Sequence, residues 1–523
     1  MKKALFTLGL GLGASVAQAQ LEQLAQGHLS GSFDSYTQYY RKDDKILAVP
    51  PQDKIGSNNF FKLDYTYKQF SAGIQYEAYL PAVQGFPFLG TKQGRNEGKL
   101  VNRYFRYSGD KVSLQVGDFY EQFGSGLVFR SWENRQIGIN NALEGVNVQI
   151  QPTDFLKLKV VYGRPREYFD YADATVRGAD ADINLSRMFV KRPTAVNVTG
   201  GLSYVSRYQE YTGADDKFPA TVNAYAARLA IEGANASLGV EYVHKGQDPH
   251  VANVFSDDNG KALLINGAYT AGKFGVNLTY RGISNMDWRS DRNAEGTVLP
   301  MNYVPALTKQ HDYLTTNIYV YNAQVAGETG GQLDVFVNLG SSKLSVNYSQ
   351  YNALKTPGSI FSPDSSFFKD GSIEWKKKWN SKWQSILSYH YVFYNKHVIE
   401  GGNDKSITSH IGLANILYKY APRKSARLEL QHLYTKEDRG NWAAAVTEFT
   451  FAPMLSVYAS DLYNYGTTKV HYYNIGGSIM KDATRFSLAY GRQRAGLFCV
   501  GGVCRYVPAA SGLTATLTIT FNN

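Results

Sequence analysis

The segment at the end of the chain, residues 512–521, constrains the fold more than any other feature. Apolar side chains and threonines alternate along it. The apolar positions are Leu513, Ala515, Leu517, Ile519 and Phe521, and the hydroxyl positions are Thr514, Thr516, Thr518 and Thr520. Because successive side chains of a β-strand point to opposite faces, one face is apolar and the other polar. An aromatic residue close to the terminus completes a pattern that is typical of the closing strand of a transmembrane β-barrel.

The amino terminus predicts export. Lys2 and Lys3 precede an apolar run over 4–16, and residues 17–19 read Ala-Gln-Ala. A basic start, an apolar core and small residues at a cleavage site define a secretory signal peptide. The core is well short of the roughly 20 residues that a spanning helix needs. We therefore expect residues 1–19 to be removed and the mature chain to begin at Gln20.

Beyond residue 19 no stretch could span a bilayer as a helix, and the mean hydropathy is −0.33. Two interpretations remain, a secreted soluble all-β protein and an outer-membrane barrel. The 39 tyrosines favour the barrel, because a ring with a polar tip suits the aromatic girdles at its interfaces. The net charge of +11 does not predict nucleic-acid binding, since no compact Lys/Arg run with interleaved aromatics accompanies it.

Two-residue periodicity recurs along the chain, and short turns alternate with long polar connections. The long connections fall at 41–58, 81–99, 246–260, 284–312, 353–365 and 395–405. Short periplasmic turns and long outer loops are the pattern of a membrane barrel. The alternation requires a strand at 174–184 and two strands within 284–330, the clearer one near 313–321. Residues 20–523 are therefore predicted to form one antiparallel transmembrane β-barrel of roughly 24–26 strands, with 26 preferred.

A barrel of this size raises the question of what fills its lumen. Only residues 20–27 precede the first predicted strand, which begins near His28, so we expect no separate plug domain. This argues against a plugged, TonB-dependent transporter. Barrels of about 22 strands already have a lumen wide enough to hold a plug. The chain must fill this one with inward loops, flatten, or hold a partner.

Segment 117–145 is the strongest candidate for an inward loop. Gly124 and Gly126 permit a sharp turn after a strand, and many aromatic residues surround a group of charges. The charges are Glu121, Arg130, Glu133 and Arg135. We predict that 122–145 folds into the lumen and narrows it, because buried charges must be paired. The alternative is an ordinary outer hairpin with salt bridges.

The polar faces of other strands predict further lumen residues. They are the basic Lys62, Lys157, Lys159, Arg228, Arg281 and Arg427 and the acidic Asp64, Glu241, Asp334 and Glu429. The slight basic excess predicts a weak anion preference if the pore is open. The alternative is that these charges pair with one another and seal it.

Cysteine and histidine add little chemistry. Cys499 and Cys504 are expected to form a disulfide across the last outer hairpin of an exported chain, and the alternative, a metal pair, has no His or carboxylate close by. His244 and His250 flank Asp248 in what is at best a loose, exposed metal candidate. The sequence shows no Ser-His-carboxylate arrangement, phosphate loop or HExxH motif. We therefore expect no enzyme and no cofactor, although a triad assembled from separate strands would escape notice.

Several motifs together resemble a known family. They are residues 119–127 (Phe-Tyr-Glu-Gln-Phe-Gly-Ser-Gly-Leu), Arg130, Arg135, 138–142, Gly145 and Val146, with weaker matches at 176–178, 307–311 and 327–332. This pattern is similar to a group of uncharacterised outer-membrane proteins of diderm bacteria, catalogued as a domain of unknown function. The resemblance covers nearly all of the mature chain. It implies an outer-membrane barrel and supplies no activity.

The sequence favours a porin-like or solute-conducting barrel in the outer membrane. The alternative is a non-conducting structural subunit of an outer-membrane assembly, export or surface-protein complex. A membrane-embedded hydrolase is a third hypothesis and needs a Ser or Asp near a His. The expected partners are outer-membrane lipids and other outer-membrane or periplasmic proteins. Basic turns at 376–382 and 423–424 could touch anionic head groups, although a solvated turn explains them equally well.

Overall fold

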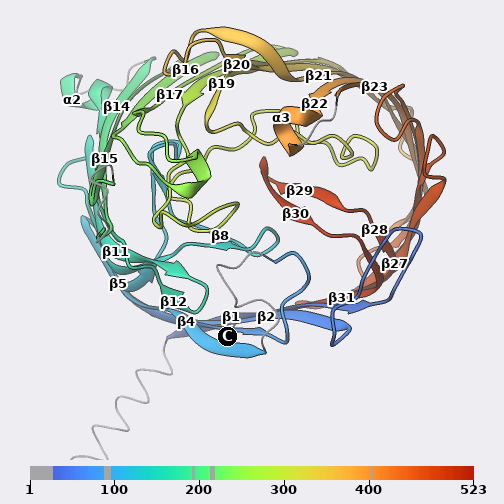
Figure 1. The fold of residues 1–523 in the computed structure, drawn as a ribbon, viewed down its shortest axis with the longest axis horizontal. Coiled ribbons are helices and arrows are strands. Elements are labelled where there is room, and N and C mark those ends of the chain that lie inside the picture. The colour runs from blue at the N-terminus through green and yellow to red at the C-terminus, as the bar shows by residue number, and fades with distance from the viewer. Residues whose placement is uncertain (1–26, 87–95, 191–194, 212–217, 402–404, 523) are drawn as a thin grey trace, which may run out of the picture.

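The chain forms one closed ring of antiparallel strands (Figure 1). The computed structural model describes residues 27–86, 96–190, 195–211, 218–401 and 405–522. The predicted signal peptide and the residues that bear on an N-terminal plug lie outside these ranges. Within them, no helix combines the length and the hydropathy that a membrane-spanning helix needs.

The wall of the ring contains 24 strands. In chain order they are β1 (His28–Tyr40), β2 (Ile55–Tyr67), β3 (Phe70–Tyr79), β4 (Glu97–Ser108), β5 (Val112–Phe119), β10 (Leu143–Ile150), β11 (Leu156–Glu167), β13 (Thr175–Asn184), β14 (Asn197–Tyr208), β15 (Thr221–Glu232), β16 (Ala236–Lys245), β17 (Gly260–Ala271), β18 (Phe274–Ser284), β19 (Gly327–Leu339), β20 (Ser342–Leu354), β21 (Pro363–Lys378), β22 (Trp383–Asn395), β23 (Ser406–Ala421), β24 (Lys424–Tyr434), β25 (Trp442–Phe451), β26 (Leu455–Asn464), β27 (Val470–Lys481), β28 (Thr484–Gln493) and β31 (Ala510–Asn522).

Short elements belong to the connections between wall strands. They are β6 (Gln122–Phe123), β7 (Phe129–Arg130), β8 (Glu133–Asn134), β9 (Ile139–Asn140), β12 (Asp170–Tyr171), β29 (Gly496–Val500), β30 (Val503–Val507), α2 (Leu185–Phe189), η2 (Val251–Asn253) and α3 (Lys396–Glu400). The strands among them pair locally and are not part of the closed wall.

The ring closes between β1 and β31. β1 pairs with β2 on one side and with β31 on the other, where Gly31 lies opposite Phe521 and Tyr39 opposite Leu513. A closed ring satisfies the backbone hydrogen bonds of every strand, as a lipid environment requires. The two-faced pattern of the closing strand is confirmed: Phe521 stacks on Phe61 on the outer surface, whereas Thr516 lines a cavity inside the ring.

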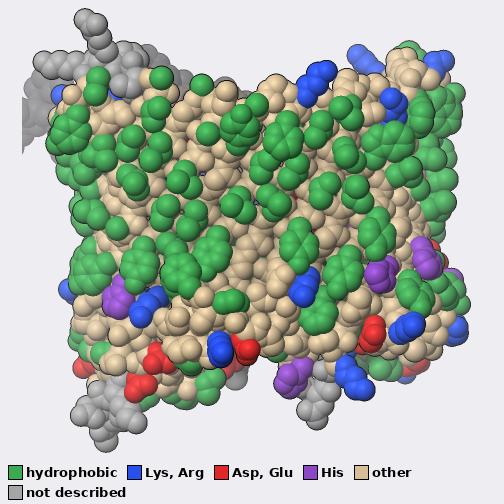
Figure 2. Space-filling model, turned by 90° about the horizontal axis from the view of Figure 1, so that it is seen from above, with side chains coloured by type: hydrophobic (Ala, Val, Ile, Leu, Met, Phe, Trp, Pro, Cys, Tyr) green, Lys and Arg blue, Asp and Glu red, His purple; other side chains and the backbone are tan. Residues whose placement is uncertain are grey.

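The outer surface carries a broad band of hydrophobic side chains. Figure 2 shows this band, with most of the visible charged side chains and histidines gathered near its edges. Exposed residues from many strands contribute to it, among them Leu202, Leu278, Leu430 and Ile475. A contiguous apolar surface of this extent is suited to lipid and not to water. The outward faces of the alternating strands therefore form the surface that contacts a membrane.

The connections at the two ends of the barrel differ in length, as the sequence predicts. Two-residue turns such as 68–69 and 482–483 lie at the end that carries the carboxyl terminus, and connections such as 120–142 lie at the other. The strand expected at 174–184 is β13. The prediction of two strands within 284–330 was wrong, because Ser284 of β18 lies directly opposite Gly327 of β19. Residues 285–326 leave the wall instead, which is why the ring has 24 strands and not 26.

A basic residue on the outer face of the closing strand should destabilise the barrel. Leu517 lies near the middle of β31 and faces outward, so Leu517→Arg places a charge in hydrocarbon at a cost of about 2–4 kcal/mol. Urea unfolding of protein refolded into lipid vesicles measures the loss. Thr516→Arg points into the lumen and is the matched control, with an expected loss of less than about 1 kcal/mol. Equal losses would contradict the assigned faces.

Candidate functional site

The lumen has two different halves along the barrel axis. Near the long connections, inward-pointing wall residues such as Val205, Val243 and Ile411 are apolar and buried. Near the short turns, inward residues such as Asn277 and Asn338 are polar and exposed. The sequence-predicted lumen residue Lys157 belongs to this polar short-turn half, whereas Arg281 lies buried in the other half. The apolar half needs something to cover it.

Long connections fold inward and cover the apolar half (Figure 1). Segment 120–142 and the first part of 285–326 pack together against the wall, with Phe123 and Trp288 fully buried in their shared core. The later part of 285–326 inserts Tyr321 into a second core of wall aromatics. Inward loops thus occupy this half of the lumen, within the part of the chain that the structure describes.

Segment 122–145 lies inside the ring, as its contacts show. Lys159 of β11 donates to the Gln122 carbonyl at 3.0 Å and to the carboxylate of the preceding residue, Glu121, at 2.8 Å. The backbone N–H of Ser125 donates to the carboxylate of Glu241, on β16, at 2.9 Å. These partners belong to inner faces of separate wall strands. The segment therefore reaches across the lumen instead of projecting outward.

The middle of the segment contacts the seam. Arg135 donates to Asp34 of β1 at 2.6 Å and to Glu133 at 2.9 Å. Arg130 forms no carboxylate pair among the described residues, and its guanidinium lies 4.0 Å from the ring centroid of Tyr303. That contact joins segment 122–145 to segment 285–326 by a cation–π interaction.

A glycine is required where the segment turns. Gly124 has a φ of +53°, and a Cβ there would lie 2.7 Å from the Glu241 carboxylate. Positive φ is the region that glycine adopts without steric cost. The turn that the sequence predicts at this position therefore brings the segment close enough to the wall for the Ser125 hydrogen bond.

Three deeply buried ion pairs join wall strands to one another or to a connection. Arg166 pairs with Glu77 at 2.6 Å, Arg207 with Asp248 at 2.8 Å, and Arg281 with Glu328 at 2.6 Å. All six side chains are 3 % exposed or less. Of these residues, only Arg281 was predicted to line the lumen. The polar faces of their strands could have identified Glu77 and Arg207, and the 327–332 motif could have identified Glu328.

The remaining predicted lumen residues are spread around the wall. Arg228 pairs with Asp180 at 2.8 Å, and Lys62 with Asp64 at 3.0 Å. Arg427 pairs with Glu429 at 3.1 Å and with Glu448 at 2.8 Å.

Lys157 and Asp334, like Arg130 and Glu241 above, have no ion pair among the described residues. Lys157 is exposed near the short turns, and Asp334 accepts a hydrogen bond from Asn347 at 2.7 Å. The hydrogen bonds and ion pairs of segment 122–145 include none with Asp334, Arg427 or Glu429, within the described ranges. The predicted residues therefore do not form one ring.

The prediction of a loose, exposed metal site at 244–250 is wrong. Asp248 and His250 are fully buried. Asp248 lies between Arg207 and Lys245, at 2.8 and 3.7 Å, and burial lowers the pKa of His250 against the opposing charge of Asp248. His244 borders a hollow that the outward-facing Tyr242 also lines. The three residues therefore have different surroundings and share no site.

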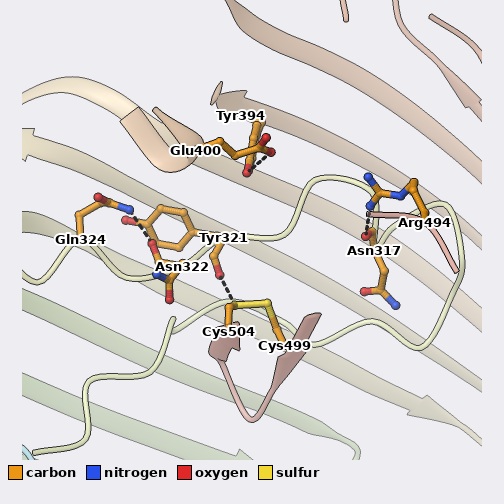
Figure 3. The surroundings of a disulfide bond; sticks show 9 residues. All are labelled: Asn317, Tyr321, Asn322, Gln324, Tyr394, Glu400, Arg494, Cys499 and Cys504. Atoms are coloured by element: carbon orange, nitrogen blue, oxygen red, sulfur yellow. Dashed lines mark hydrogen bonds between the residues drawn. A yellow bond between two sulfur atoms is a disulfide. The ribbon is translucent and has the colours of Figure 1, made fainter. Parts of the chain in front are cut away.

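The expected disulfide joins Cys499 to Cys504 across β29 and β30 (Figure 3). The predicted outer hairpin does not project outward. It turns inward against segment 285–326, where the backbone N–H of Ala306 donates to the Gly502 carbonyl at 2.9 Å. Cys504 lies beside the carbonyl of Tyr321. The disulfide thus braces an element that fills the lumen.

A cavity of about 440 Å³ lies between the seam and the inward elements. Its wall side is formed by β1, β2 and β31, and its inner side by segment 122–145 and the disulfide hairpin. The residues that line it include Asp34, Tyr36, Asn58, Thr516, Thr518, Arg135, Gln136, Phe498 and Arg505. Arg505 donates to the Gln136 carbonyl at 3.1 Å and to the Gly85 carbonyl. Carbonyl oxygens, not carboxylates, are its polar partners here.

One serine lies close to a histidine in the lumen, as a hydrolase would need. The Ser388 hydroxyl is 2.9 Å from Nε2 of His390. A catalytic triad also needs a carboxylate on the other ring nitrogen, but Asp370 contacts His311 instead. Nδ1 of His390 has no partner among the described residues. The arrangement therefore lacks the third member of a triad.

A closed ring of 24 antiparallel strands with an apolar outer band and a charged interior defines an outer-membrane β-barrel. The chain belongs to the DUF6029 family, a family of unknown function, and the family model matches residues 1–521. No curated protein matches it.

Several solved structures are similar to the chain. The translocation pore of the P pilus usher PapC has 11% identity and a TM-score of 0.45, and covers 95% of this chain and 99% of its own. The siderophore receptor PirA from Pseudomonas aeruginosa has 10% identity and a TM-score of 0.42, with 94% and 80% covered. OccAB4 of Acinetobacter baumannii has 9% identity and a TM-score of 0.39, with 96% and 99% covered.

Removing one partner of a buried ion pair should destabilise the barrel strongly. Glu77→Gln leaves the Arg166 guanidinium buried without a countercharge, at an expected cost of about 3–5 kcal/mol. Guanidinium unfolding of the refolded barrel measures this loss. Asp44→Asn, which breaks the exposed Lys42–Asp44 pair, is the control and should cost at most about 1 kcal/mol. A small loss in Glu77→Gln would mean that the Arg166 side chain is solvated.

Proposed function

We propose that this protein resides in the outer membrane and conducts small polar solutes through its lumen, with a weak preference for anions. The proposed passage follows the inner face of the seam, past segment 122–145. The observation that carries the proposal is the cavity between the seam and the inward elements. The proposal assigns the chain no enzymatic activity, and it makes the lipids of the outer membrane its surroundings.

The position of the cavity supports a passage along the seam. Asp34 and Thr518 lie opposite each other in the middle of the seam, and Gln493 lies at the long-connection end of β28. All three line the cavity, which thus extends from the middle of the barrel toward its long-connection end. The short-turn half beyond it has a polar wall. A solute entering from either end meets hydroxyl, amide and charged groups along this side.

The charges around the cavity support an anion preference. Asp34 is paired with Arg135 at 2.6 Å, whereas Arg505 has no ion pair among the residues that the structure describes. Burial lowers the pKa of Arg505, yet a guanidinium stays charged at neutral pH. The cavity therefore has a net positive lining, and rings or clusters of Arg favour anions in pores.

A second candidate function is a non-conducting subunit of an outer-membrane assembly, export or surface-protein complex. The observation that favours it is the packing of the long-connection half, where inward segments form apolar cores and buried ion pairs. In that case the open short-turn half would receive a periplasmic protein. Extraction in mild detergent tests it, since a barrel without co-purifying proteins would remove its basis.

The purified barrel should conduct in planar bilayers and favour anions in a KCl gradient. Arg505→Ala removes the cavity's unpaired cation, so the anion-to-cation permeability ratio should fall by about twofold or more. The reversal potential measures this ratio. Arg187→Ala, at the exposed helix α2 outside the lumen, is the matched control and should leave it unchanged. Silence from correctly folded, inserted barrels would overturn the proposal and favour the second candidate.

A further inference from the structure

A cluster of potential metal ligands lies elsewhere in the lumen, away from the seam cavity. His311 comes from the inward segment 285–326, Asp370 from β21 and His390 from the neighbouring strand β22. One ligand atom from each residue lies within 4.8 Å of the other two. Two imidazoles and one carboxylate are a donor set that suits first-row transition metals. Nothing in the proposed conduction path uses these residues.

The residues on the wall are buried and carry free donor atoms. Asp370 and His390 are 2 % and 1 % exposed. Oδ1 of Asp370 and Nδ1 of His390 have no hydrogen-bond partner among the described residues. Buried polar atoms are nearly always satisfied in folded proteins. Unpartnered atoms on two neighbouring ligand side chains indicate a ligand that satisfies both.

Nε2 of His390 already makes the kind of hydrogen bond that orients a metal-binding histidine. Nε2 lies 2.9 Å from the Ser388 hydroxyl. A histidine bound to a metal usually donates its other ring N–H to a nearby oxygen, which fixes the tautomer and the orientation of the ring. When Nε2–H of His390 donates to the Ser388 hydroxyl, Nδ1 carries no proton and its lone pair is free to bind a metal.

The distances fit a metal ion once one ligand side chain moves. Nε2 of His311 lies 3.1 Å from Oδ2 of Asp370, close to the separation expected for two adjacent ligands each about 2.1 Å from one ion. Ligand atoms of a tetrahedral site lie about 3.4 Å apart, so atoms as far apart as the 4.8 Å bound of the cluster must approach by about 1.4 Å. His311 is on a connection and not on the wall, so it can make that movement.

The geometry points to a site for one divalent transition-metal ion of the Zn²⁺ type, bound by His311, Asp370 and His390. Three protein ligands leave at least one position for water. The bound ion would join the inward segment 285–326 to β21 and β22. Lys309 is the nearby cation that opposes binding through its charge, whereas Asp370 supplies a compensating negative charge.

Calorimetric titration of the detergent-solubilised barrel, produced without a histidine tag, with Zn²⁺ tests the site. We expect one Zn²⁺ per barrel, with affinity at least tenfold weaker in Asp370→Asn and His390→Ala. His410→Ala is the matched control, because His410 lies on the adjacent strand β23 and hydrogen-bonds Tyr389 at 2.7 Å. It should bind Zn²⁺ as the unchanged protein does. Heat-dependent gel mobility verifies that each variant is folded.

A second measurement needs no variant. Co²⁺ added to the unchanged barrel should produce the visible absorption of a four- or five-coordinate site, and Zn²⁺ should displace it. No Zn²⁺ binding, binding that both substitutions leave intact, or Co²⁺ that stays octahedral would each overturn the proposal. The three side chains would then serve only to anchor segment 285–326 to the wall.

Discussion

The width of the ring is the constraint on which the rest of the structure depends. A closed wall of 24 strands encloses more space than its own side chains can fill. The chain meets this constraint with long connections that fold inward. They cover wall residues such as Val243 and Ile411, which would otherwise line the lumen as bare apolar surface. The wall there is apolar because the inward segments provide the other side of a core.

Buried charges help to fix the connections against the wall. Arg207 of β14 pairs with Asp248 of connection 246–259. Arg281 of β18 pairs with Glu328 of the neighbouring wall strand and also donates to the Pro305 carbonyl of segment 285–326. Each of these charges depends on its partner, because an unpaired buried charge is strongly unfavourable. Such pairs specify positions as well as adding contacts. Around the seam the pairing is incomplete, since Arg505 has only carbonyl partners and a cation–π contact among the described residues. The seam is therefore one part of the lumen where a cation has no paired carboxylate, and the proposed passage follows it.

The wall could be predicted from the sequence because alternation and turn length are local properties. The closing strand at 512–521 and the strand at 174–184 follow from them. Segment 285–326 could not be predicted, because a buried residue such as Tyr321 looks the same whether it packs against lipid or a core. The Arg166–Glu77 pair is 89 residues apart, and the cluster of His311 with Asp370 depends on where an inward segment rests. Neither the ion pair nor the cluster leaves a pattern in the local sequence.

Cross-linking can test directly whether segment 122–145 lies inside the ring against the seam. Cysteines in place of Asp34 and Arg135, whose side chains meet at 2.6 Å, should be joined by a short bis-maleimide in the lipid-embedded barrel. Mass spectrometry of the digested protein detects the link. The matched pair replaces Phe33, the preceding residue of β1 on the opposite face, together with Arg135, and should remain unlinked. Because segment 122–145 lies inside the ring against the seam, only the first pair should link; no linkage there, or equal linkage in both pairs, would contradict an inward segment held at the seam.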